Sequence, residues 1–160
     1  MQDIEMLHHI HKSTEMGREG ILSVLGSAKD AALRTALEQQ LTEYEQMMGS
    51  SARLLEERGK TPKGAPAAAK LSARMTSAVK TWMDPSPSKI AEMMVQGNTM
   101  GMTKSLRQMR TYASEDGRVK DLADKLLQTE EANIQQMKGF LYSRRERCTP
   151  LPLLFPLRKS

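Results

Sequence analysis

The sequence has few of the residues that reinforce a small domain through covalent or metal bonds. Among its 160 residues it contains one cysteine, Cys148, and only 4% aromatic residues. A lone cysteine excludes an internal disulfide framework and a cluster of thiolate metal ligands. No apolar run approaches the roughly 20 residues of a membrane-spanning helix, and no stretch shows the alternation typical of a β-strand. We therefore expect a chain without a membrane span that is folded through helices alone.

The net charge of +5 comes mostly from the C-terminal tail, residues 142–160, which contains five basic side chains and one acidic one. The preceding residues carry 19 basic and 18 acidic groups. Nucleic-acid binding needs clustered Lys and Arg to neutralise phosphates, so we expect no nucleic-acid partner for this part. The N-terminal residues include acidic side chains and lack the apolar run of a signal peptide. The expected location is the cytoplasm.

What the sequence does contain is a helical repeat of apolar residues, in which Leu, Ile and Met recur every three or four positions. Glycine commonly follows a helix end, and Gly26 and Gly59 follow two of these stretches. The break after Gly26 is short, which makes its two flanking helices antiparallel neighbours. The predicted helices cover, approximately, Asp3–Leu25, Asp30–Arg58, Ser86–Ala113 and Arg118–Leu141, with Asp3 as the expected cap of the first.

The third helix is expected to be split near Asp84–Pro87. A first piece covers about Ala67–Met83, and Ser86 caps a second piece that has Pro87 at its first position. The sequence thus predicts an all-α, antiparallel up-down-up-down four-helix bundle over residues 1–141. An irregular tail, 142–160, follows it.

A layer of polar residues interrupts the apolar stripes at the middle height of all four helices. Glu130 is the sharpest case, because it falls between Leu126 and Met137 of one stripe. A buried carboxylate must be paired or protonated, and we favour a buried pair between Arg18 and Glu130. The expected members of this buried layer are Arg18, Gln40, Tyr44, Asn98, Glu130 and Asn133.

The same height offers a metal or small-ligand pocket as the alternative. His11 and Glu15 are four residues apart, a spacing that suits two ligands of one ion, and Glu130 would be the third ligand. Histidine is a common ligand of transition metals, but His8 and His9 project in different directions on a helix. We favour a surface histidine cluster over a metal site.

Two glycines lie four positions apart inside the third predicted helix. Each of them, Gly97 and Gly101, costs about 1 kcal/mol relative to alanine in a helix. Close approach of a neighbouring helix is the favoured reason. The alternatives are room for a ligand beside Asn98 or a contact between subunits.

Four long helices with a polar middle layer resemble the ferritin-like superfamily. The segments IEMLHHIHKSTEMGREGI, LEQQLTEYEQM, SPSKIAEMMVQGNTMGM and LADKLLQTEEANIQQMKGFL also resemble a group of uncharacterised bacterial small helical-bundle proteins. The resemblance implies a di-iron site built from Glu and Glu-x-x-His, in which Glu15 would supply one ligand. Here Glu130 is followed by Asn133 instead of histidine, and Glu43 and Glu92 point outward. The resemblance therefore implies the fold without the metal.

We expect a non-enzymatic bundle that acts through protein contacts, as a homo-oligomer and without a cofactor. The alternative is a ferritin-like bundle that binds iron or another divalent transition metal at His11, Glu15 and Glu130. The apolar tail segment PLPLLFPL would either dock in a partner's groove or be an extension from a shifted reading frame. We favour the second origin because its composition differs abruptly from that of the bundle.

Overall fold

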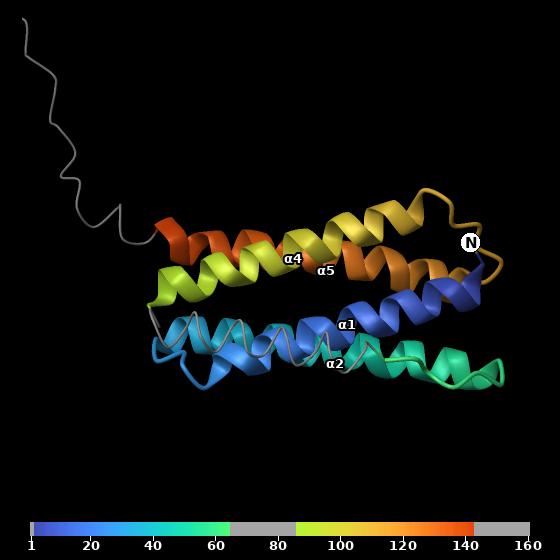
Figure 1. The fold of residues 1–160 in the computed structure, drawn as a ribbon, viewed down its shortest axis with the longest axis horizontal. Helices are drawn as coiled ribbons and strands as arrows, with labels where there is room; N and C mark the ends of the chain where they lie inside the picture. The colour runs from blue at the N-terminus through green and yellow to red at the C-terminus, as the bar shows by residue number, and fades with distance from the viewer. Residues whose placement is uncertain (1, 65–85, 143–160) are drawn as a thin grey trace, which may run out of the picture.

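The computed structural model describes residues 2–64 and 86–142, which form four α-helices and no β-strand (Figure 1). The all-α bundle is therefore confirmed for this part of the chain. None of the four helices has a segment that is both long and apolar enough to cross a membrane. The expected helix at 67–83 and the tail after residue 142 lie outside the described residues. The helices are α1 (Asp3–Leu25), α2 (Ala31–Glu57), α4 (Pro87–Met109) and α5 (Gly117–Tyr142).

Local capping explains where two of the helices begin. The side chain of Asp30 accepts a hydrogen bond from the Leu33 amide at 2.9 Å, and that of Ser86 accepts one from the Lys89 amide at 3.3 Å. Both residues satisfy a backbone donor that a helix start leaves open. Gly59 follows α2 with a φ of 65°, a conformation that favours glycine. The predicted cap at Ser86 and the predicted end signal at Gly59 are confirmed.

The cap of α1 is Gln2, and the prediction of Asp3 was wrong. Asp3 is buried and accepts a hydrogen bond from the Tyr112 hydroxyl beyond the end of α4. The Asp3 carboxylate therefore makes a tertiary contact. At the start of the helix, the backbone N–H of Gln2 donates to the Glu5 carboxylate at 3.2 Å.

The helices run in a different order of directions from the one predicted. The start of α1 contacts the last turns of α4 through His9 and Ser105, and Arg58, after α2, pairs with Asp116, before α5. The ends of α2 and α4 therefore meet the starts of α1 and α5 at one end of the bundle (Figure 1). The order is up-down-down-up, and the up-down-up-down prediction is wrong. Only a short connection fixes the relative direction of two helices, and residues 58–86 are a long one.

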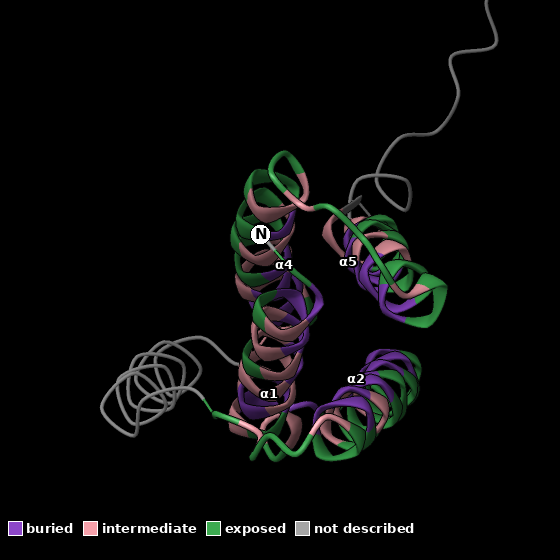
Figure 2. Ribbon diagram, turned by 90° about the vertical axis from the view of Figure 1, so that its right-hand side faces the viewer, coloured by how far each residue is buried: buried purple, intermediate pink, exposed green. Residues whose placement is uncertain are grey.

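Two helical hairpins make up the bundle, α1–α2 and α4–α5. Each hairpin packs more extensively within itself than against the other. Figure 2 shows the two seams between them, where α1 faces α4 and α2 faces α5. The two helices of each hairpin and the helices that face each other across these seams are antiparallel, whereas α1 also contacts α5, which runs in the same direction.

Leucine, isoleucine and methionine fill the space between the helices. Met47 is buried on α2, and its neighbour Met48 is half-buried. The fully buried side chains of largest volume are Met6, Leu7, Ile10, Ile21, Leu33, Leu37, Met47, Leu55, Ile90, Leu126, Met137 and Gln40. Gln40 is the polar exception in this list, and it leads to the layer at middle height.

Candidate functional site

A hydrogen bond between Tyr44 and Asn98 crosses the centre of the bundle from α2 to α4. The Tyr44 hydroxyl donates to Asn98 Oδ1 at 2.6 Å, and Asn98 Nδ2 donates to the Met94 carbonyl at 2.8 Å. Gly17 of α1 makes room for the phenol ring, because a Cβ at this position would lie 2.6 Å from Tyr44 Cζ. Burial, followed by the nearby Glu130, raises the pKa of Tyr44 well above its usual value. Tyr44 therefore remains a hydrogen-bond donor at neutral pH.

Glu130 of α5 lies in the same layer and is only 2% exposed. A Cβ at Gly101 would lie 2.5 Å from Glu130 Oε1, so the glycine provides the space that the carboxyl occupies. Close packing against a neighbouring side chain is therefore the reason for the glycine at 101. No atom of the described residues lies within 4 Å of the corresponding position at Gly97, so their packing gives no reason for this glycine.

The Glu130 carboxyl has no basic partner among the described residues. Burial raises its pKa from 4.5 to about 8, and a hydrogen bond with Ser105 opposes this rise. Its Oε2 atom is buried with no hydrogen-bond partner in residues 2–64 and 86–142. A carboxyl in such surroundings avoids the cost of a buried charge by keeping its proton.

The expected ion pair between Arg18 and Glu130 is wrong. Arg18 bonds the Glu45 carboxylate at 3.2 Å through Nε and the Glu19 carboxylate at 3.1 Å through Nη1. These contacts hold the guanidinium at the edge of the α1–α2 hairpin, about one-third exposed. Protonation of Glu130 therefore takes the place of the expected positive charge.

Ser105 extends the layer to α1. Its hydroxyl lies 3.1 Å from His9 Nε2, and the Ser13 hydroxyl lies 3.5 Å from the same nitrogen. Burial lowers the pKa of His9, and Lys104 and Lys12 lower it further. A neutral imidazole is therefore favoured, and the polar groups His9, Ser105 and Glu130 connect three helices.

Sequence periodicity missed His9 because it assigned each helix a single buried stripe. In a four-helix bundle each helix also contacts two neighbours at its flanks, and His9 lies on the flank of α1 that faces α4. The one sequence feature that could have indicated this contact is the position of the histidine between Leu7 and Ile10, two buried residues of α1. Ser105 gave no signal that distinguishes it from an ordinary surface serine.

The remaining amide side chains join α2 to α5. Gln40 Nε2 donates to Gln136 Oε1 at 2.7 Å, while Gln40 Oε1 and Asn133 Nδ2 are buried without a partner among the described residues. The structure thus buries five of the six residues predicted for the layer, with 2–5% exposure for Gln40, Tyr44, Asn98, Glu130 and Asn133. Arg18 is the one that it places elsewhere.

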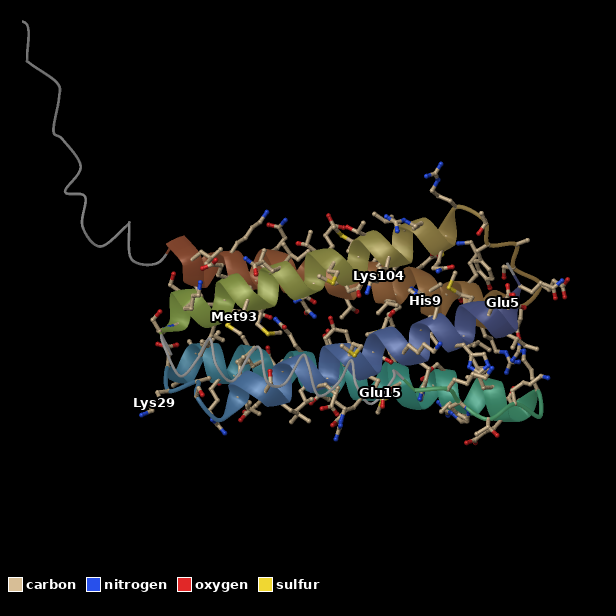
Figure 3. All side chains as sticks on the ribbon, viewed as in Figure 1. Glu5, His9, Glu15, Lys29, Met93 and Lys104 are labelled. Atoms are coloured by element: carbon tan, nitrogen blue, oxygen red, sulfur yellow. The ribbon has the colours of Figure 1, made fainter. Side chains whose placement is uncertain are left out.

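The three residues of the metal alternative do not come together. His11 Nδ1 contacts the Ser51 hydroxyl of α2 at 3.2 Å, and the Glu15 carboxylate lies beside Gly64. Figure 3 shows Glu15 away from the flank of α1 on which His9 faces α4. No group of three or more His, Cys, Asp or Glu within the described part of the chain is placed to hold a metal ion.

Two shallow hollows on the surface lie at the end of the bundle where Arg58 and Asp116 meet. Leu54 and Leu122 form the apolar floor of the larger one, and charged side chains surround them. Neither hollow is lined by a residue of the polar layer. Among the described residues, the layer is therefore not reached from either of these two hollows.

Neither protein-family models nor curated proteins give a match to the chain. Among solved structures, it is similar to the crystal structure of a DUF305 fragment from Deinococcus radiodurans, with a TM-score of 0.67. The match covers 87% of this chain and 94% of that chain at 14% sequence identity. At this identity the likeness shows a shared helical fold alone, and it does not identify the chain as ferritin-like.

Proposed function

We propose that this bundle has no catalytic activity and acts by binding another polypeptide through the outer face of α4. The observation that carries the proposal is the exposure of two large apolar side chains on that face, 61% for Met100 and 50% for Leu106. The α4 outer face is defined by the exposed residues Gln96, Thr99, Met100, Thr103, Lys104, Leu106, Arg107 and Arg110. Apolar side chains within a polar rim are typical of protein contact sites.

The charge of this face is one-sided. Lys104, Arg107 and Arg110 are basic, and the sequence contains no Asp or Glu from Met93 to Ser114. The acidic residue nearest to it on α4, Glu92, is paired with Lys89 at 3.1 Å. The α4 outer face therefore offers three cations beside two apolar anchors, although the bundle as a whole is nearly neutral.

An acidic amphipathic segment of a partner protein has the complementary chemistry. Its apolar side chains would pack on Met100 and Leu106 while its carboxylates face the three cations, which adds specificity and speeds association. A second copy of this chain fits less well, because a two-fold contact would bring the three cations of both copies into one interface, and the exposed residues of this face include no carboxylate to oppose them. The expected homo-oligomer would need another surface and stays a prediction, as does the cytoplasmic location.

The buried polar layer supports a role without catalysis. Its five buried members are at most 5% exposed, and three of them, Gln40, Tyr44 and Asn98, are hydrogen-bonded across or along helices. Such groups fix which helix faces meet. They present no open position at which a substrate could react.

Titration with synthetic peptides tests the proposal. The probe is an 18-residue peptide with leucines at helical i, i+3, i+4, i+7 spacing and glutamates elsewhere, and its comparison has the same composition with scattered leucines. We expect the full chain to bind the first peptide more tightly, with an affinity that falls as salt rises. Equal affinity for the two peptides would show a general attraction of polyanions and contradict the proposal.

Paired variants locate the surface. The double change Met100→Ser/Leu106→Ser should weaken binding by about tenfold, equivalent to about 1.4 kcal/mol, and Lys104→Glu/Arg107→Glu should weaken it at least as much. The matched controls are Leu22→Ser on α1 and Lys125→Glu on α5, both exposed positions. A control that weakens binding as much as the α4 variants would place the contact elsewhere. Tighter binding to vesicles of anionic lipid than to the peptide would point to a membrane surface instead.

A further inference from the structure

Glu130 lies in the α4–α5 hairpin, beside the polar groups that link this hairpin to α1–α2. Its carboxyl extends from α5 to Gly101 and Ser105 of α4, and Ser105 in turn contacts His9 of α1. Tyr44 of α2 is close enough for the Glu130 charge to raise its pKa. The carboxyl therefore packs against α4, is linked to α1 through Ser105 and His9, and lies near Tyr44 of α2.

The groups around Glu130 provide little to stabilise a negative charge. The titratable group that faces it from α2 is Tyr44, whose hydroxyl proton is donated to Asn98, and the one from α1 is His9, which reaches it through Ser105. From α4 it meets Gly101 and Ser105, and Lys104 beside them is exposed to solvent. On α5 itself, the nearest amide side chain of the layer is Asn133, which interacts with Tyr44.

We propose that the proton on Glu130 controls how tightly the hairpins α1–α2 and α4–α5 pack. The bundle closes around the neutral carboxyl, and loss of the proton loosens the seams between the two hairpins.

We expect the two hairpins to separate at the seams between them when Glu130 loses its proton. A charged carboxylate needs water or donors, but Oε1 fills the space beside Gly101 and Oε2 has no hydrogen-bond partner in the described part of the chain. The hairpins pack less extensively against each other than within themselves, so water can reach the carboxylate most easily by parting them. The raised pKa of about 8 places the change near neutral pH.

The direction of the pH effect follows from the two states. Unfolded, Glu130 ionises near 4.5, whereas in the closed bundle it keeps its proton up to about pH 8. Below pH 4.5 the carboxyl is neutral in both states and costs the closed form nothing. The closed form loses stability steadily as pH rises from 4.5 to 8, and above pH 8 the loss is complete.

Thiol labelling reports whether the seam opens. Ala36 is buried on α2, one turn before Gln40, which contacts α5. An Ala36→Cys substitution in a Cys148→Ser background provides a single thiol at the α2–α5 seam, and far-UV circular dichroism reports helix content. The comparison is made at pH 5 and pH 9 with Glu130 intact and with Glu130→Gln, which keeps the shape of the neutral acid. Glu131→Gln, at the exposed neighbouring position, is the control.

With Glu130 intact, we expect labelling at pH 9 to be at least ten times faster than in the Glu130→Gln chain, at equal helix content. The two chains should label equally at pH 5, and Glu131→Gln should behave like the parent chain at both. Equal labelling of the parent and Glu130→Gln chains at pH 9 would overturn the proposal. Faster labelling accompanied by loss of helix would also overturn it, because global unfolding would then replace an opening between hairpins.

Discussion

At the scale of single residues, the two glycines of α4 have opposite surroundings although they lie one turn apart. Gly101 supports the Glu130 carboxyl, and Gly97 is exposed with open space around it. Sequence reasoning gave both of them one cause, close packing, which holds only for Gly101. The difference depends on which side of the helix faces α5, and helical periodicity alone does not reveal that.

Alanine substitutions at the two glycines should therefore change the free energy of unfolding in opposite directions. Gly97→Ala should raise the free energy of unfolding by about 1 kcal/mol, since alanine is the better helix former. Gly101→Ala gains the same propensity but forces a methyl group to 2.5 Å from Glu130 Oε1. Its net effect should be a loss of about 1–3 kcal/mol from overpacking. Urea unfolding of both variants checks the pair, and an equal gain at both positions would show that the carboxyl can move aside.

The burial of Glu130 was predictable from the sequence, but the group that accommodates its carboxyl was not. The alternation of apolar and polar residues on the last helix identified a carboxyl within the buried stripe. A buried carboxyl can be accommodated by a cation or by a proton. The predicted cation, Arg18, instead pairs with Glu19 and Glu45. Which side chain points at which depends on helix rotation of a few tens of degrees, and no local pattern contains that information.

At the scale of elements, the starts of the helices were predictable because their signals are local, whereas α4 ends at Met109 and not at the predicted Ala113. A cap residue and the amide that it bonds lie three positions apart, as at Ser86 and Lys89. The direction of α4 was not predictable, because it depends on a connection of many residues. The contact of His9 on α1 with α4 was not predicted for a related reason, because predicting it requires knowing which helix lies beside α1.

The cap of α4 gives a prediction at this scale. Ser86→Ala removes the acceptor for the Lys89 amide and should lower the free energy of unfolding by about 1 kcal/mol. Ser114→Ala, at an exposed serine in the turn before α5, is the control and should change it by less than about 0.5 kcal/mol. Thermal and urea unfolding measure both. A loss no greater than that of the control would mean that Pro87 alone determines the start of the helix.

At the scale of the whole molecule, the net charge and the similarity of fold convey little about function. The α4 outer face carries three basic side chains, whereas the rest of residues 1–141 carries 16 basic and 18 acidic ones, so an overall count of charge conceals the basic face. The polar layer occupies the height at which ferritin-like bundles hold metal, but the histidines here face Ser51 and Ser105. A shared helical fold therefore does not transfer a metal site to this chain.

Elemental analysis of protein purified without a histidine tag checks this conclusion. We expect less than one-tenth of an equivalent of iron, manganese or zinc per chain, since His11, Glu15 and Glu130 lie in three separate contacts. The His11→Ala and Glu130→Gln variants should leave that content unchanged. About one metal per chain that is lost in either variant would restore the metal-binding alternative.

The up-down-down-up order also determines the electric field of the bundle. Each helix carries a partial charge of about +0.5 at its N-terminus and about −0.5 at its C-terminus. Two starts and two ends of the four described helices meet at each end of the bundle, so these partial charges cancel there. Neither end attracts ions through its backbone, and a charged partner would be guided by side chains along the flanks, chiefly those of α4.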